Sequence, residues 1–192
     1  TLVASPTSVV ANGSTTSSVT VTLADANGNL LSASGGTVAL SSTGSATISA
    51  VTDNANGTYT ATVTNTVAES VTISGTLDGA AITDTATITF TVGAADPTNS
   101  NTTLVASPTS VVANGSTTSS VTVTLADANG NLLTASGGTV ALSSTGSATV
   151  SAVTDNGNGT YTATVTNTVA ESVTISGTLD GAAITDTATI TF

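Results

Sequence analysis

Hydrophobic and polar residues alternate with a period of two along short stretches of this chain. In the first half, Val, Ala, Ile, Leu or an aromatic residue alternates with threonine over residues 19–23, 59–63, 71–73 and 86–90. Such alternation predicts half-buried strands with one apolar face and one hydroxyl face. Weaker strands are expected over residues 2–11, with a kink at Pro6, and over residues 36–41 and 46–51. No stretch has helical periodicity, so the pattern predicts an all-β fold.

Turn signals separate the predicted strands. The dipeptides that favour tight turns are Asn12-Gly13, Asn27-Gly28, Asn56-Gly57 and Asp78-Gly79. About seven short strands in about 90 residues is the number expected for an immunoglobulin-like β-sandwich.

The second half of the chain repeats the first. Residues 103–192 match residues 1–90 at an offset of 102, with three differences: Ser32/Thr134, Ile48/Val150 and Ala55/Gly157. The repeat predicts two tandem immunoglobulin-like domains of about seven strands each, over residues 1–95 and 103–192. Residues 96–102 form the linker, and the near-identity indicates a recent duplication within a longer tandem array.

Charge narrows the classes of function. The chain has 11 acidic residues and no Lys, Arg or His. Nothing can neutralise phosphates, so a nucleic-acid partner is excluded. No internal salt bridge can form except through the N-terminal amine. No run of 18 apolar residues occurs, so membrane insertion is not expected, and the absence of Cys excludes disulfides and thiolate metal sites.

The residue inventory also argues against catalysis. Ser and Thr nucleophiles need a general base, which is normally His or Lys. The Asp78 and Asp84 carboxylates lie near one predicted hairpin, but a glycosidase would also need aromatic side chains that stack on sugars. We therefore expect no catalytic residues, no firmly assigned cofactor, and no enzyme.

Two further motifs have ordinary structural explanations. The sequence DANGN at residues 25–29 suggests a calcium loop, but its Gly is fourth and the closing Glu is missing, so a plain turn is expected. Tyr59 follows another turn, at residues 53–57, and is expected to pack at a corner of the fold.

Three stretches carry a resemblance to a known family. SPTSVVANGSTTSSVTVTLADANGNLL resembles the opening of a bacterial immunoglobulin-like domain of the intimin and invasin adhesin type. DNANGTYTATVTNT and ATITFTVGAADP resemble its later turn-strand and its closing strand with linker. The resemblance covers almost all of each repeat. It implies stacked β-sandwich modules in the stalk of an extracellular adhesin on a bacterial cell surface.

The expected function is therefore mechanical. The repeats would serve as a spacer that projects a distal binding domain from the cell, with neighbouring repeats as partners and the host surface reached through a domain outside this sequence. One alternative is an adhesive module that itself binds a host protein or glycan. Another is adsorption to ice or another surface through the paired threonines of the strands.

Acidic residues gather where the two repeats are predicted to meet. If the strands alternate up and down, one junction receives five carboxylates, from Glu69, Asp96, Asp127, Asp155 and Asp180. Like charges closer than a Debye length repel one another unless a cation lies between them. Because Ca²⁺ prefers hard oxygen ligands, we predict a calcium ion that rigidifies this joint. The alternative is that the carboxylates are solvated.

Overall fold

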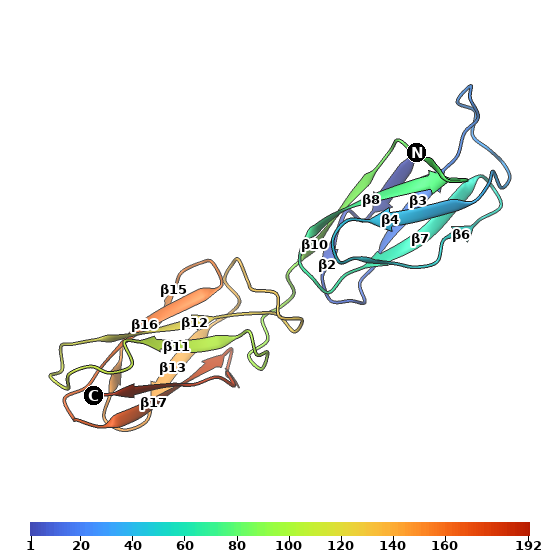
Figure 1. The fold of residues 1–192 in the computed structure, drawn as a ribbon. Helices are drawn as coiled ribbons and strands as arrows, with labels where there is room; N and C mark the ends of the chain where they lie inside the picture. Colours follow the sequence, from blue (N-terminus) through green and yellow to red (C-terminus); the bar gives the residue numbers. More distant parts are fainter. The chain divides into compact units, whose positions relative to one another are not determined.

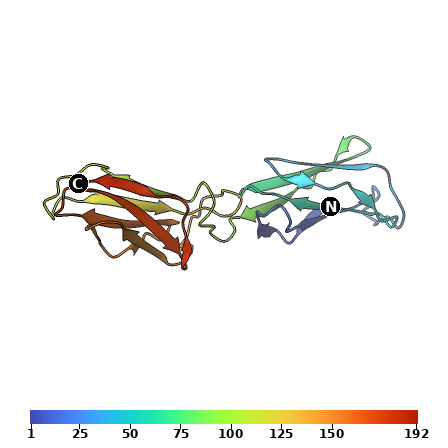
Figure 2. The ribbon, with the colours of Figure 1, turned by 90° about the horizontal axis from the view of Figure 1, so that it is seen from below.

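The computed structural model describes residues 1–192 and divides the chain into two compact units, Thr1–Val92 and Gly93–Phe192. Each unit consists of β-strands and turns without helices, and Figure 1 shows the strands of each unit. The turned view in Figure 2 shows that they lie in two layers. The all-β sandwich predicted from the alternation is confirmed. The structure contains no apolar helix long enough to cross a membrane.

The first unit has two five-stranded sheets. One has the order β1-β3-β7-β5, with β6 also paired to β7; the other has the order β2-β10-β8-β4, with β9 also paired to β8. Pairing is antiparallel except between β2 and β10, which run parallel. The strands are β1 (Leu2–Ser5), β2 (Ser8–Val10), β3 (Ser17–Thr22), β4 (Val38–Ser42), β5 (Thr47–Ile48), β6 (Thr52–Asp53), β7 (Thr58–Thr64), β8 (Ser70–Leu77), β9 (Ala80–Ala81) and β10 (Ala86–Thr91).

The second unit repeats this arrangement. One sheet has the order β11-β12-β16-β14, with β15 paired to β16; the other has the order β13-β17-β18, with β19 paired to β17. An isolated parallel bridge between Ser110 and Thr191 stands where β2 meets β10 in the first unit. The strands are β11 (Thr103–Ser107), β12 (Ser119–Thr124), β13 (Val140–Ser144), β14 (Thr149–Val150), β15 (Thr154–Asp155), β16 (Thr160–Thr166), β17 (Ser172–Leu179), β18 (Ala182–Ala183) and β19 (Ala188–Thr191).

The alternating apolar residues form the core between the two layers. Val19 and Val21 of β3 are fully buried and face Ile73 of β8 and Ile88 of β10 in one cluster. The intervening threonines lie on the outer face, as the period of two predicts. Every buried side-chain polar atom has a hydrogen-bond partner, so the core carries no unsatisfied polar group.

The predicted strand over residues 2–11 is two strands in two different sheets. Pro6 lies between β1 and β2, and the chain changes from one layer to the other at this point. The predicted kink is thus a change of sheet. It suits Pro, which has no N–H to donate to a ladder.

Two other predicted strands have different bounds. Residues 46–51 do not form one strand, because the chain pairs with β7 twice, as β5 and β6, and leaves Ser49 to Val51 outside the ladder. The strand predicted at residues 71–73 extends as β8 to Leu77, across Gly75. A Cβ on Gly75 would lie 3.0 Å from Leu40 Cδ2 and 3.2 Å from Ile82 Cδ1, so these side chains pack closely over the glycine and would have to shift for a larger residue.

Candidate functional site

Residues 93–102, here called the junction segment, fold onto the second unit. The Asp96 N–H donates to the Ala126 carbonyl oxygen (2.8 Å), and the Ala126 N–H donates to the Thr102 hydroxyl (3.0 Å). Thr102 is 1% exposed, and Ala95 packs against the core of the unit. The junction segment therefore belongs to the second compact unit, which begins at Gly93.

Asp127 anchors the start of the junction segment. Its Oδ2 accepts a hydrogen bond from the Gly93 N–H (2.9 Å), and Ala95 pairs with Asp127 in an isolated antiparallel bridge. The carboxylate also accepts bonds from the Asn129 and Asn131 N–H groups. Burial raises the pKa of Asp127. The Asn131 side chain and these backbone donors together lower it by more than burial raises it, so the pKa lies below its usual value.

Asparagine side chains hold the other end of the junction segment. Asn99 Nδ2 donates to the Ala128 carbonyl (3.2 Å) and Asn101 Nδ2 donates to the Gly130 carbonyl (2.9 Å). The sequence did not predict these contacts, because asparagine residues are also common in flexible linkers. The feature that could have predicted them is the amide group of each side chain, which can donate a hydrogen bond to the backbone of a neighbouring turn.

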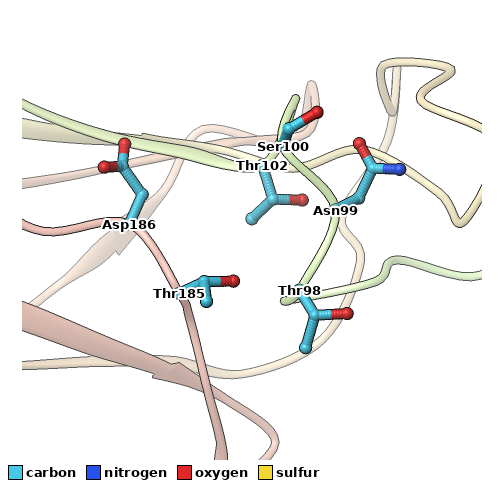
Figure 3. A pocket seen from close by; sticks show the side chains of 6 residues that line it. All are labelled: Thr98, Asn99, Ser100, Thr102, Thr185 and Asp186. Carbon is cyan, nitrogen blue, oxygen red and sulfur yellow. The ribbon is translucent and has the colours of Figure 1, made fainter.

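The junction segment also reaches the connection between β18 and β19. The Thr185 N–H and hydroxyl both donate to the Pro97 carbonyl, at 3.1 and 3.2 Å. An open polar pocket of about 440 Å³ lies between these two stretches. Figure 3 shows its six lining side chains: Thr98, Asn99, Ser100 and Thr102 from the segment, with Thr185 and Asp186 on the other side. The lining has hydroxyl, amide and carboxylate groups but no aromatic ring.

Asp96 lies within the junction segment, and its carboxylate closes a local turn. Its Oδ1 accepts hydrogen bonds from the Thr98 N–H (2.8 Å) and the Thr98 hydroxyl (2.7 Å). The Thr98 side chain, followed by the Thr98 N–H, lowers the pKa of Asp96. Asp96 is thus held by its carboxylate, through Thr98, and by its backbone N–H, through Ala126.

The other three residues of the predicted calcium set are bonded within their own units. In the first unit, Glu69 accepts from the Ser45 N–H (2.6 Å) and from Asn65 Nδ2 (2.9 Å). In the second unit, Asp155 accepts from the Gly157 N–H and Asp180 from the Thr139 N–H, each at 2.8 Å.

Within the second unit, the structure brings the backbones of Asp96 and Asp127 together through the junction segment. Asp155 and Asp180 both lie near the Gly138-Thr139 turn. Gly138, Thr139 and Asp155 line a second pocket, and the Thr139 N–H donates to the Asp180 carboxylate. Within neither unit do three or more acidic side chains form a group that could hold a metal ion. A calcium ion shared by the five carboxylates stays a prediction from the sequence.

Three other expectations from the sequence are met. The DANGN turn is closed by Asp25 itself, which accepts from the Asn27 and Asn29 N–H groups. Tyr59 is 2% exposed and its hydroxyl donates to the Gly36 carbonyl (2.7 Å), as expected for a corner residue. The one ion pair of the chain joins the N-terminal amine and Asp84 at 3.9 Å.

Comparison with known families gives a match over nearly the whole chain. Residues 1–93 and residues 96–192 each match the family described as "Invasin, domain 3". No curated protein sequence matches the chain.

Solved structures of bacterial adhesins share the fold. The crystal structure of invasin, described as a bacterial integrin-binding protein, is 29% identical with a TM-score of 0.66. InvD of Yersinia pseudotuberculosis is 33% identical (TM-score 0.63), and the adhesin InvE of the same organism is 26% identical (TM-score 0.51). All of this chain is covered in each case, but it spans only 39%, 56% and 58% of those chains.

Proposed function

Because this chain belongs to the invasin domain 3 family, as two tandem immunoglobulin-like domains of the intimin and invasin adhesin type, we propose that it is a spacer. The two domains are part of a stalk that projects a distal binding domain from a bacterial cell surface. Contact with the host is made by that distal domain, and the partners of these repeats are neighbouring repeats. Relatives of this type are adhesin domains and not enzymes.

One observation carries the proposal: the chain contains the same domain twice, with almost no chemistry that differs between the copies. The three substitutions between the repeats are conservative in size or in turn character. A dedicated binding site needs one copy, whereas a spacer gains length from every identical copy. Most apolar residues of each copy are gathered in its core, and the large exposed ones are single residues far apart along the sequence.

The spacer function is tested by changing repeat number on a cell surface. A reporter binding domain is displayed on one, two or four copies of residues 1–102, and its capture of ligand-coated beads is measured. We expect capture to rise with copy number while the repeats without the reporter capture nothing. Capture that is independent of copy number would contradict the proposal.

The competing binding function is tested by screening the 192-residue chain against host proteins and glycans. The spacer proposal predicts no specific binding. Reproducible submicromolar binding that is lost in Thr98→Val or Asn99→Ala, which alter the polar pocket of Figure 3, would assign the chain an adhesive function instead.

A further inference from the structure

Two loops of identical sequence, ADANGNLL at residues 24–31 and 126–133, differ in exposure. Ala126 is 0% exposed and Asp127 is 2% exposed, whereas Ala24 and Asp25 are both exposed. Since the sequences are the same, the difference comes from what covers each loop. In the second unit the cover is the junction segment.

The uncovered loop already has the shape of the covered one. The Asp25 N–H donates to the Asn29 carbonyl at 2.9 Å, and the Asp127 N–H donates to the Asn131 carbonyl at 2.9 Å. Each loop also contains the same isolated bridge. The junction segment is therefore not needed to shape the loop, and residues 24–31 present a preformed surface.

The N–H and carbonyl groups of one loop residue form hydrogen bonds to the junction segment in the second unit, and the same groups form no such bonds in the first. Ala126 receives a bond from the Asp96 N–H and gives one to the Thr102 hydroxyl, but Ala24 makes neither bond. Space above the loop is open as well. A Cβ built on Gly130 would lie 2.7 Å from Asn101 Nδ2, whereas a Cβ built on Gly28 would meet nothing within 4 Å.

The difference in exposure extends beyond the loop to two apolar residues of each unit. Leu179 and Ile184 are each 4% exposed, whereas their counterparts Leu77 and Ile82 are only half-buried. Ile184 directly precedes Thr185, which donates to the Pro97 carbonyl in the junction segment. Ala95 of the junction segment packs against the core cluster that contains Leu179 and Ile184.

We infer that residues 24–31, with Leu77 and Ile82, form an acceptor surface for a second segment of the type GAADPTNSNT, supplied by polypeptide directly ahead of Thr1. In this arrangement each repeat is completed by the segment that enters it. The inference concerns how a repeat is finished and does not depend on the spacer function.

The connection of the chain identifies this source of the segment. Thr102 directly precedes Thr103, the counterpart of Thr1, so a segment fused ahead of Thr1 reaches the acceptor surface over the same covalent path. The segment of a second copy of the chain is already bound to its own second unit and would have to be released first. An attached segment also has a high effective concentration, which a free one lacks.

The test extends the full chain by the ten residues GAADPTNSNT ahead of Thr1. Segmental isotope labelling of residues 1–92 separates signals of the two repeats in NMR spectra. We expect the Ala24 amide to exchange with solvent about tenfold more slowly in the extended chain, because a hydrogen bond of ordinary net strength protects it. Its chemical shift should move toward that of Ala126.

Two controls make the result specific. An extension with the same ten residues in scrambled order should leave Ala24 exchange unchanged. An extension ending in Val in place of its last Thr removes the hydroxyl that would accept from Ala24, and should give no protection. Unchanged exchange with the correct extension, or protection by the free peptide but not by the attached one, would overturn the inference. The surface-display experiment decides the spacer function separately.

Discussion

At the scale of single residues, the buried Asp127 carboxylate shows how a chain without basic side chains handles charge. Transfer of an ionised carboxylate out of water is costly unless donors replace the lost hydration. Here the donors are backbone N–H groups and an asparagine amide, including the Gly93 N–H at 2.9 Å. Asp25 has the same loop donors but lacks the one from a junction segment. The chain therefore contains its own matched control.

Replacing Asp127 with Asn should destabilise the second unit. The NH₂ group that replaces one carboxylate oxygen accepts no hydrogen bond, and the one remaining oxygen cannot accept both from the Gly93 N–H and from the Asn129 and Asn131 N–H groups. We expect Asp127→Asn to lower the free energy of unfolding of the second unit by about 1–3 kcal/mol.

Fluorotyrosine labelling places one NMR probe in each unit, at Tyr59 and Tyr161, so that urea unfolding of the two units is followed separately. Asp25→Asn, the matched control, should lower the stability of the first unit by a smaller amount. Equal losses from the two substitutions would show that the junction segment contributes nothing to Asp127.

Acid should weaken the second unit through the same carboxylate. The pKa of Asp127 is lowered in the folded state from a value near 3.9 in the unfolded chain. The stability that it provides is therefore present above that value and lost as pH falls through the folded pKa. We expect the urea midpoint of the second unit to decline below about pH 4, with a shallower decline in Asp127→Asn. An identical pH profile in wild type and variant would contradict this.

At the scale of elements, the sequence predicts what depends on local pattern and misses what depends on neighbours. The strands that become β3, β7 and β10 follow from alternation, because apolar positions two residues apart face one core. The extension of β8 across Gly75 could not be predicted, since Gly weakens a strand signal and only the close approach of β4 explains it. The change of sheet at Pro6 was visible only as a kink.

The junction segment was the largest element missed. Its Gly, Asn and Ser are typical of flexible linkers, and only the three-dimensional position of Ala126 gives them fixed partners. Asp96 and Asp127 were predicted as calcium ligands, and the contacts that the structure shows for their carboxylates are with N–H and hydroxyl groups. The calcium ion predicted for them is untested.

The Thr102 hydroxyl should be important for holding the junction segment against the second unit. It donates to the Asp96 carbonyl (2.7 Å) and accepts from the Ala126 N–H (3.0 Å) while 1% exposed. We expect Thr102→Val, which keeps the shape but removes both bonds, to lower the stability of the second unit by about 1–3 kcal/mol. Ser100→Ala, at an exposed position of the same segment, should have little effect. The same fluorotyrosine NMR measurement applies, and a neutral Thr102→Val would refute this assignment.

At the scale of the whole molecule, the charge of −11 has no internal counterion apart from the N-terminal amine. Carboxylates in both units have lowered pKa values because N–H and hydroxyl donors surround them, with Glu69 held chiefly by the Ser45 N–H and Asp155 by the Ser136 side chain. Each unit thus stabilises its acids locally. Repulsion between all of them remains, and dissolved cations screen it.

Calcium provides the measurement that separates specific binding from general screening. If the junction binds Ca²⁺ as predicted from the sequence, millimolar CaCl₂ should raise the melting temperature in calorimetry, and a chelator should reverse the rise. NaCl at equal ionic strength is the control for screening. A melting temperature that responds equally to the two salts, or to neither, would exclude the calcium joint.

The binding of the junction segment to its own loop also bears on digestion. A protease needs several residues of backbone that can leave their hydrogen bonds and extend into its cleft, and the stretch between domains is where nicking usually occurs. In this chain the N–H groups of Gly93, Asp96 and Thr102 are all engaged, and no Lys or Arg is present for trypsin-like enzymes. We therefore expect the junction segment to resist cleavage for as long as the second unit stays folded.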